Sequence, residues 1–132
     1  MTAPARKLMV VEDDPGLQRQ LRWCFEGYEV LTMGDRVHAL EQIHRHKPPV
    51  VTLDLGLPPD PDGSSEGFAT LEQILSIAPH TKVIVVTGNN DRENAVRAVG
   101  MGAYDFFNKP INAELLGFLV NLDPSAILPL FL

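Results

Sequence analysis

Carboxylates, a hydroxyl and a lysine follow four separate apolar runs of this sequence. Glu12, Asp13 and Asp14 come directly after the first run, and Asp54 closes another, in VVTLD. Carboxylates that share one pocket repel each other unless a cation neutralises them. A site lined with hard oxygen ligands suits hydrated Mg²⁺. These acids therefore predict a magnesium site, provided that the fold brings them together.

Thr87 ends the run KVIVVT, and Lys109 follows the run YDFFN. A carboxylate beside a metal, a lysine and a hydroxyl is the set of groups that phosphoryl transfer needs. Asp54 is the natural nucleophile, and Asp13 would hold the metal. Lys109 would contact a phosphoryl oxygen and the Asp54 carboxylate, while Thr87 would donate a hydrogen bond to another phosphoryl oxygen.

The elements that must position these groups alternate along the chain, without repeats or low-complexity tracts. Apolar runs predict strands over 8–11, 28–33, 50–54, 82–87 and 104–107. Amphipathic runs predict helices over 17–25, 35–47, 68–77 and 92–99, with a last helix from about 112. Strands rich in Val, Ile and Leu that alternate with helices are typical of a parallel sheet covered on both faces. The prediction is an α/β doubly wound fold of five parallel strands, whose carboxyl ends gather the polar residues at one edge.

Length and composition narrow the class of protein. A chain of 132 residues with 45% hydrophobic residues suits one domain with a real core. The net charge of −6 argues against direct binding of nucleic acid or of an anionic membrane. Cys24 is the only cysteine, which excludes an internal disulfide and a cysteine-based zinc site. The apolar run near the N-terminus is too short for a signal peptide or membrane span, so we expect a cytoplasmic protein.

Four ordered motifs carry a resemblance to a known family. They are VVEDD at 10–14, LDLGLP at 53–58, VVTG at 85–88 and GAYDFFNKP at 102–110. Together they resemble the CheY-like receiver domain of response regulators in bacterial two-component systems. The resemblance implies a flavodoxin-like sheet with strand order 2-1-3-4-5. It also implies a receiver domain over 1–122, followed by an irregular apolar tail over 123–132, with no effector domain in this chain.

The same resemblance assigns roles to residues. Mg²⁺ would be bound by Asp13, Asp54 and the main-chain carbonyl of Gly56, with Glu12 acting through water. A cis peptide would join Lys109 to Pro110. Thr87 and Phe106 would form the switch pair that moves on phosphorylation, although Phe106 would be a core aromatic in most proteins.

The function implied is a signalling switch, and the chain would be no enzyme beyond its own phosphorylation and dephosphorylation. A sensor histidine kinase or phosphotransfer protein would donate a phosphoryl group to Asp54, and an effector domain outside this chain would control transcription. The resemblance also allows a homodimer through the surface of the fourth helix, fifth strand and fifth helix. A weaker resemblance is to receivers of transcription regulators of PEP-CTERM and exopolysaccharide systems, which share a long acidic loop like the one at 58–67.

Two alternatives use the same residues differently. A receiver that acts only by contact would have lost one or more pocket groups, and none is missing here. A phosphohydrolase of the haloacid dehalogenase type also uses a strand-end aspartate and Mg²⁺, but its chemistry needs a second acid two residues after the nucleophile. Gly56 occupies that position.

Overall fold

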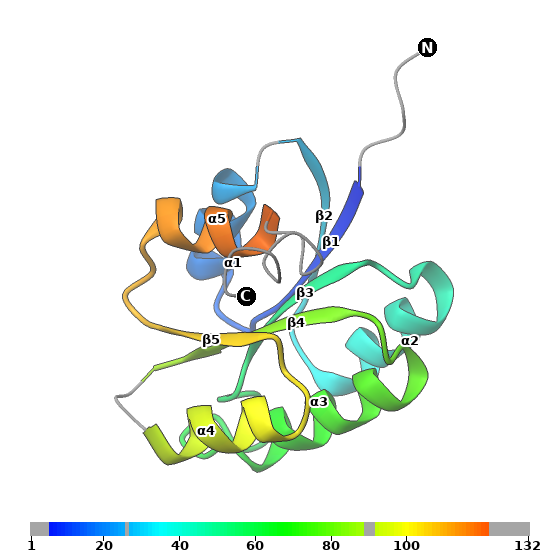
Figure 1. The fold of residues 1–132 in the computed structure, drawn as a ribbon, viewed down its shortest axis with the longest axis vertical. Coiled ribbons are helices and arrows are strands. Elements are labelled where there is room, and N and C mark those ends of the chain that lie inside the picture. Colours follow the sequence, from blue (N-terminus) through cyan, green and yellow to red (C-terminus); the bar gives the residue numbers. More distant parts are fainter. Residues whose placement is uncertain (1–5, 26, 89–91, 122–132) are drawn as a thin grey trace, which may run out of the picture.

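Five parallel strands form one sheet in the computed structural model, which describes residues 6–25, 27–88 and 92–121. The strands are β1 (Arg6–Val11), β2 (Tyr28–Met33), β3 (Val50–Asp54), β4 (Lys82–Thr87) and β5 (Asp105–Asn108). Their order across the sheet is β2-β1-β3-β4-β5 (Figure 1), which confirms the predicted order. Every neighbouring pair is parallel, so the carboxyl ends of all five strands lie at the same edge.

Five helices cover the two faces of this sheet. They are α1 (Pro15–Cys24), α2 (Arg36–His46), α3 (Ser65–Ile77), α4 (Arg92–Gly100) and α5 (Ala113–Asn121). Helices α1 and α5 lie on one face, and α2, α3 and α4 lie on the other (Figure 1). Asp14 caps α1 by accepting hydrogen bonds from the amides of Gly16 and Leu17, and Asp35 caps α2 by accepting one from His38. Among the described residues, no helix is both long and apolar enough to cross a membrane.

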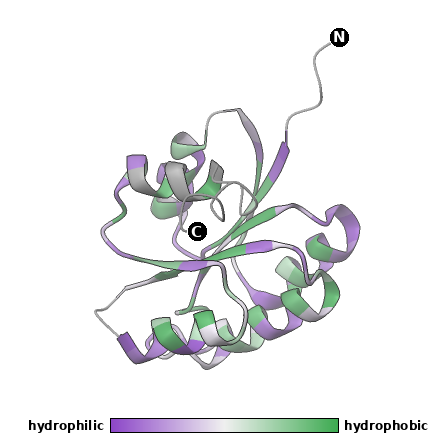
Figure 2. Ribbon diagram, viewed as in Figure 1, coloured by the Kyte–Doolittle hydropathy of each residue, from purple (hydrophilic) through white to green (hydrophobic). Residues whose placement is uncertain are grey.

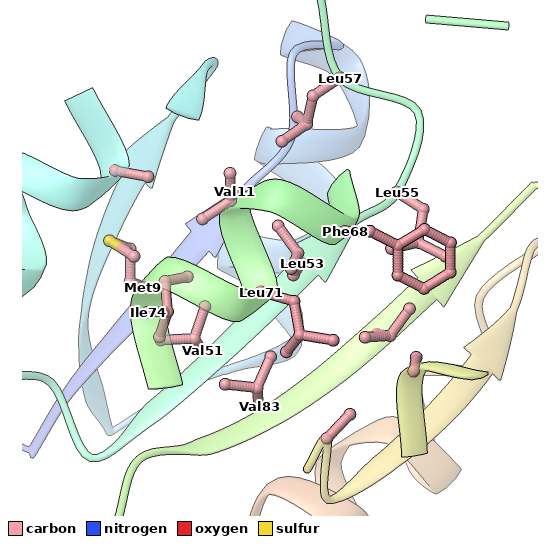
Figure 3. Packing of buried hydrophobic residues seen from close by; sticks show 14 of the residues in the cluster. Met9, Val11, Val51, Leu53, Leu55, Leu57, Phe68, Leu71, Ile74 and Val83 are labelled. Atoms are coloured by element: carbon pink, nitrogen blue, oxygen red, sulfur yellow. The ribbon is translucent and has the colours of Figure 1, made fainter. Parts of the chain in front are cut away.

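The period of two along each strand divides the core into two layers. Met9 and Val11 of β1 belong to the cluster under α2, α3 and α4, whereas Leu8 and Val10 belong to the cluster under α1 and α5. In Figure 2, green stretches run along the strands, and green and purple stretches alternate along the helices. Figure 3 shows α3 placing Phe68, Leu71 and Ile74 over the strands, close to Val51, Leu53 and Val83. Both faces of the central strands are buried, which explains their near-continuous apolar sequence.

The predicted start of α3 was wrong by three residues. The helix begins at Ser65, so the loop predicted over 58–67 ends at Ser64. The composition of residues 65–67 favours a loop, but packing against Leu55 places Gly67 in the first turn of α3, where it is buried. A Cβ atom on Gly67 would lie 2.4 Å from the Cα and carbonyl oxygen of Leu55, so the helix can approach this close to the backbone only at a glycine. The tail predicted over 123–132 lies outside the described residues.

Candidate functional site

Three carboxylates meet at the carboxyl edge of the sheet. Glu12 and Asp13 follow β1, and Asp54 is the last residue of β3. Strands β1 and β3 are paired neighbours in the sheet, so their carboxyl ends lie side by side. One carboxylate oxygen from each of the three acids lies within 4.8 Å of the other two. Glu12 and Asp54 are buried, whereas Asp13 is exposed. This geometry provides an all-oxygen cluster that is open to solvent on one side.

Hydrogen bonds and burial act together on Glu12. Its backbone amide donates to the Met33 carbonyl at 2.9 Å, and its Oε2 accepts a hydrogen bond from the Asp14 amide at 3.2 Å. Burial and the nearby Asp54 charge raise the pKa of Glu12 from 4.5 to about 7, although Lys109 opposes this shift. Two buried acids held this close together need a positive charge to keep both ionised.

Lys109 supplies one positive charge to this cluster from the end of β5. Its Nζ atom lies 3.0 Å from Glu12 Oε1 and 3.5 Å from Asp54 Oδ2, so one ammonium group bridges both acids. Burial lowers the pKa of Lys109, but the charges of Asp54 and Glu12 outweigh burial and hold the pKa above its usual value. The peptide bond between Lys109 and Pro110 is cis, as is the one between Pro58 and Pro59.

Asp54 opens onto a cavity of about 470 Å³. Its Oδ1 atom accepts a hydrogen bond from the Gly56 amide at 3.1 Å, which orients the carboxylate. The cavity is lined by Asp54, Leu55, Gly56, Pro61, Asp62, Gly63, Ser64, Thr87, Gly88, Asn94 and Lys109. The candidate nucleophile, the lysine and the threonine therefore share one water-accessible space.

Thr87 is held at this cavity by β5. Its hydroxyl donates to Asn108 Oδ1 at 3.0 Å, and its carbonyl accepts a hydrogen bond from the Lys109 amide at 2.8 Å. Phe106 is half-buried against the core cluster and is not among the cavity-lining residues. The structure thus brings together the polar residues predicted from the sequence, while Phe106 packs against the core cluster outside the cavity lining.

A divalent cation fits the chemistry of the acid cluster. Glu12 Oε1 is buried, and the Lys109 ammonium group lies 3.0 Å from it. The available donors are carboxylate and carbonyl oxygens, the ligands that Mg²⁺ prefers. Glu12, Asp13 and Asp54 are the residues that can hold such an ion.

Sequence reasoning missed several residues of the cavity. Asp62 and Ser64 lie in the loop before α3, and Asn94 lies in α4. None of them directly follows an apolar run at the end of a strand. Only the tertiary arrangement of this loop and of α4 places them around the same cavity as Asp54.

Comparisons with known proteins identify the family. The protein-family model of the response regulator receiver domain matches residues 8–121 of the sequence. The chain belongs to the response regulator receiver domain family. This receiver domain has the predicted sheet order, and it is similar in structure to a CheY-like response regulator receiver domain protein from Methanospirillum hungatei. That similarity has a TM-score of 0.76 at 29% identity and covers 86% of this chain and 88% of that one.

Curated relatives of this receiver domain are regulatory proteins. The nitrogen assimilation regulatory protein NtrX of Azorhizobium caulinodans is 33% identical over 115 residues, which cover 85% of this chain and 24% of that protein. The transcriptional regulatory protein KdpE of Mycobacterium tuberculosis is 34% identical over 113 residues, which cover 81% of this chain and 46% of that protein. The chain therefore spans about a quarter to a half of the length of these relatives.

Proposed function

We propose that this receiver domain is a phosphorylation switch whose phosphoacceptor is Asp54. The observation that carries the proposal is the convergence of Asp54, Lys109 and Thr87 on one open cavity beside the acid cluster. A sensor histidine kinase or a phosphotransfer protein is the expected donor, as membership of the family implies.

The transfer uses groups that are already positioned. An Asp54 carboxylate oxygen attacks the phosphorus atom, a new O–P bond forms, and the N–P bond to the donor imidazole breaks with its electron pair left on nitrogen. The Lys109 ammonium lies 3.5 Å from Asp54 Oδ2, where it can neutralise charge on the incoming phosphoryl group. The Thr87 hydroxyl lines the same cavity and can donate to another phosphoryl oxygen once it leaves Asn108.

Mg²⁺ is the metal proposed for this site, with Asp13, Asp54, the Gly56 carbonyl and, through water, Glu12 as its ligands. When bound, it would neutralise the clustered acids and the phosphoryl oxygens. The charge of the site supports this assignment, because Lys109 supplies one positive charge to a cluster of three carboxylates.

The structure offers no support for the hydrolase alternative. Such an enzyme would need an acidic side chain at position 56, two residues after the nucleophile. A Cβ atom on Gly56 would lie 2.7 Å from the Pro61 carbonyl oxygen, so the loop leaves no room for any side chain there. Stoichiometric phosphorylation fits this site better than turnover.

The proposed output is control of transcription through a further domain, because the regulatory relatives are much longer than this chain. Phosphorylation would draw the Thr87 hydroxyl from Asn108 toward Asp54 and would alter the packing of Phe106 on the neighbouring strand. The surface of α4, β5 and α5 would then change its contacts, with a homodimer as one outcome.

Intact-protein mass spectrometry tests the proposal directly. We expect incubation with acetyl phosphate and Mg²⁺ to add one phosphoryl group, and we expect EDTA to prevent the gain. Peptide mapping should place the phosphoryl group on the segment that contains Asp54. The proposal fails if no phosphoryl group is added, or if EDTA makes no difference.

Replacing Lys109 with alanine should slow phosphorylation by acetyl phosphate by about a hundredfold, the usual effect of losing one oxyanion-stabilising donor. The same change leaves the buried Glu12 carboxylate without its ion pair, so thermal stability at pH 8 should also fall. Initial rates from intact mass and thermal unfolding measure the two effects.

A double variant separates the two roles of Lys109. Adding Glu12→Gln to Lys109→Ala should restore much of the stability, because the Glu12 charge is no longer left buried without its partner, without restoring the rate. Recovery of the rate together with stability would mean that Lys109 only supports the fold.

A further inference from the structure

The loop before α3 folds back onto the phosphoacceptor end of β3. A Cβ atom on Gly56 would lie 2.7 Å from the carbonyl oxygen of Pro61, so the Pro61 backbone covers Gly56 directly. The residues Pro61 to Ser64 then form one wall of the cavity, with Asp54, Thr87 and Lys109 on its other sides. The loop is therefore part of the site in which Asp54 would react.

Asp60 holds this loop in a defined conformation. Its amide donates to the Leu57 carbonyl at 3.0 Å, and its carbonyl accepts from the Gly63 amide at 3.2 Å. Its Oδ2 atom accepts a hydrogen bond from the Ser65 hydroxyl at 2.6 Å. These contacts brace the loop from both ends, with Asp62 between them on the cavity wall.

Asp62 adds negative charge to a site that already contains excess acid. Lys109 is the one cationic side chain among the residues that line the cavity, and it is already paired with Glu12 and Asp54. Asp62 is exposed, and no ion pair with it is found among the described residues, so no cationic side chain there neutralises its charge. Charge at the edge of a binding site changes the rate at which ions enter it.

We infer that Asp62 is a specificity residue that slows phosphorylation by small anionic phosphodonors. The inference rests on the proposed function of Asp54. The carboxylate of Asp62 repels a free donor in proportion to the donor's charge, and salt screens this repulsion. A protein donor is less affected, because its docking energy comes from contacts outside the cavity. The loop thus favours phosphorylation by a protein partner over phosphorylation by small metabolites.

The test compares two small donors at pH 7.5 and saturating Mg²⁺, so that changes in metal affinity do not enter. Acetyl phosphate is doubly charged at this pH, and phosphoramidate is singly charged. Initial rates are measured by intact mass for wild type, Asp62→Asn and Asp62→Glu. Glu29→Gln is the matched control, since it removes an exposed acid on the edge strand β2, away from the cavity.

At low ionic strength we expect Asp62→Asn to react with acetyl phosphate about three- to tenfold faster than wild type. Phosphoramidate carries half the charge of acetyl phosphate, so its repulsion energy should be half as large. Its gain in rate should therefore be close to the square root of the gain with acetyl phosphate. Both gains should shrink as salt is raised to about 0.5 M, where the Debye length is only a few ångströms. Asp62→Glu and Glu29→Gln should behave as wild type.

Four results would overturn the inference. Unchanged rates for Asp62→Asn would show that its charge does not reach the donor. An equal gain with both donors, or one insensitive to salt, would show that bulk and not charge limits access. A wild type that reacts with neither donor would sink the proposed function of Asp54, and the role of Asp62 with it.

Discussion

Replacing Asp54 with asparagine is expected to abolish phosphorylation by acetyl phosphate completely while leaving the fold intact. An amide has no anionic oxygen to attack phosphorus, yet it has nearly the same shape as the carboxylate. The side-chain oxygen of the asparagine can still accept the hydrogen bond that the Gly56 amide donates to Asp54 at 3.1 Å. The variant also removes a negative charge that raises the pKa of Glu12, so Glu12 should ionise at lower pH than in wild type.

Intact mass after incubation with acetyl phosphate and Mg²⁺ measures the loss, and circular dichroism with a thermal melt checks the fold. Asp14→Asn is the matched control. Asp14 lies beside the acid cluster but caps α1, a role that asparagine fills equally well, so this variant should be phosphorylated like wild type. A phosphoryl group that still appears on the Asp54→Asn variant would mean that another side chain is the acceptor.

Replacing Gly67 with valine should destabilise the domain strongly. The Cβ position of Gly67 lies 2.4 Å from the backbone of Leu55, which cannot yield as a flexible side chain would. Overpacking typically costs about 1–3 kcal/mol, and a branched side chain against backbone belongs at or above the upper end. Against a typical total stability of about 5–15 kcal/mol, the loss should lower the melting temperature by about 10 °C or more.

Thermal unfolding of Gly67→Val, Gly67→Ala and Gly100→Ala measures this effect. The Gly67→Ala variant should lose less stability than the Gly67→Val variant, because alanine adds only the Cβ atom and improves helix propensity. Gly100 ends α4 with nothing within 4 Å of its Cβ position, so alanine there should be neutral or stabilise by up to about 1 kcal/mol. If Gly67→Ala matched Gly100→Ala, α3 would have room to move away from β3.

Much of the architecture could be predicted from the sequence, because strands buried on both faces have a strong local signature. The apolar runs 28–33, 50–54 and 82–87 coincide with β2, β3 and β4, and the alternating helices imply parallel connections. Element ends were less predictable where tertiary packing overrides composition. Ser65 to Gly67 have loop-forming composition but form the first turn of α3, since the contact with Leu55 requires glycine.

The candidate site was also predictable from the sequence only in part. The acids after β1 and β3, Thr87 after β4 and Lys109 after β5 could be assigned to one edge, because parallel strands end together. The distances between these groups, on which their reactivity depends, could not be predicted from the sequence. The bridge from Lys109 to both Glu12 and Asp54, and the raised pKa of Glu12, depend on burial and on separations of a few ångströms.

The sequence by itself determined the kind of protein: an α/β receiver domain with a strand-end aspartate, an acid cluster, a threonine and a lysine in a fixed order. Local patterns of strand burial and strand-end residues predict the fold class and the reacting groups, and the resemblance of the ordered motifs indicates the family. Only the tertiary structure decided that Pro61 closes over Gly56 and that Asp62 lines the phosphoacceptor cavity. The path of a polar loop depends on long-range contacts and backbone hydrogen bonds, which no periodicity in the sequence encodes.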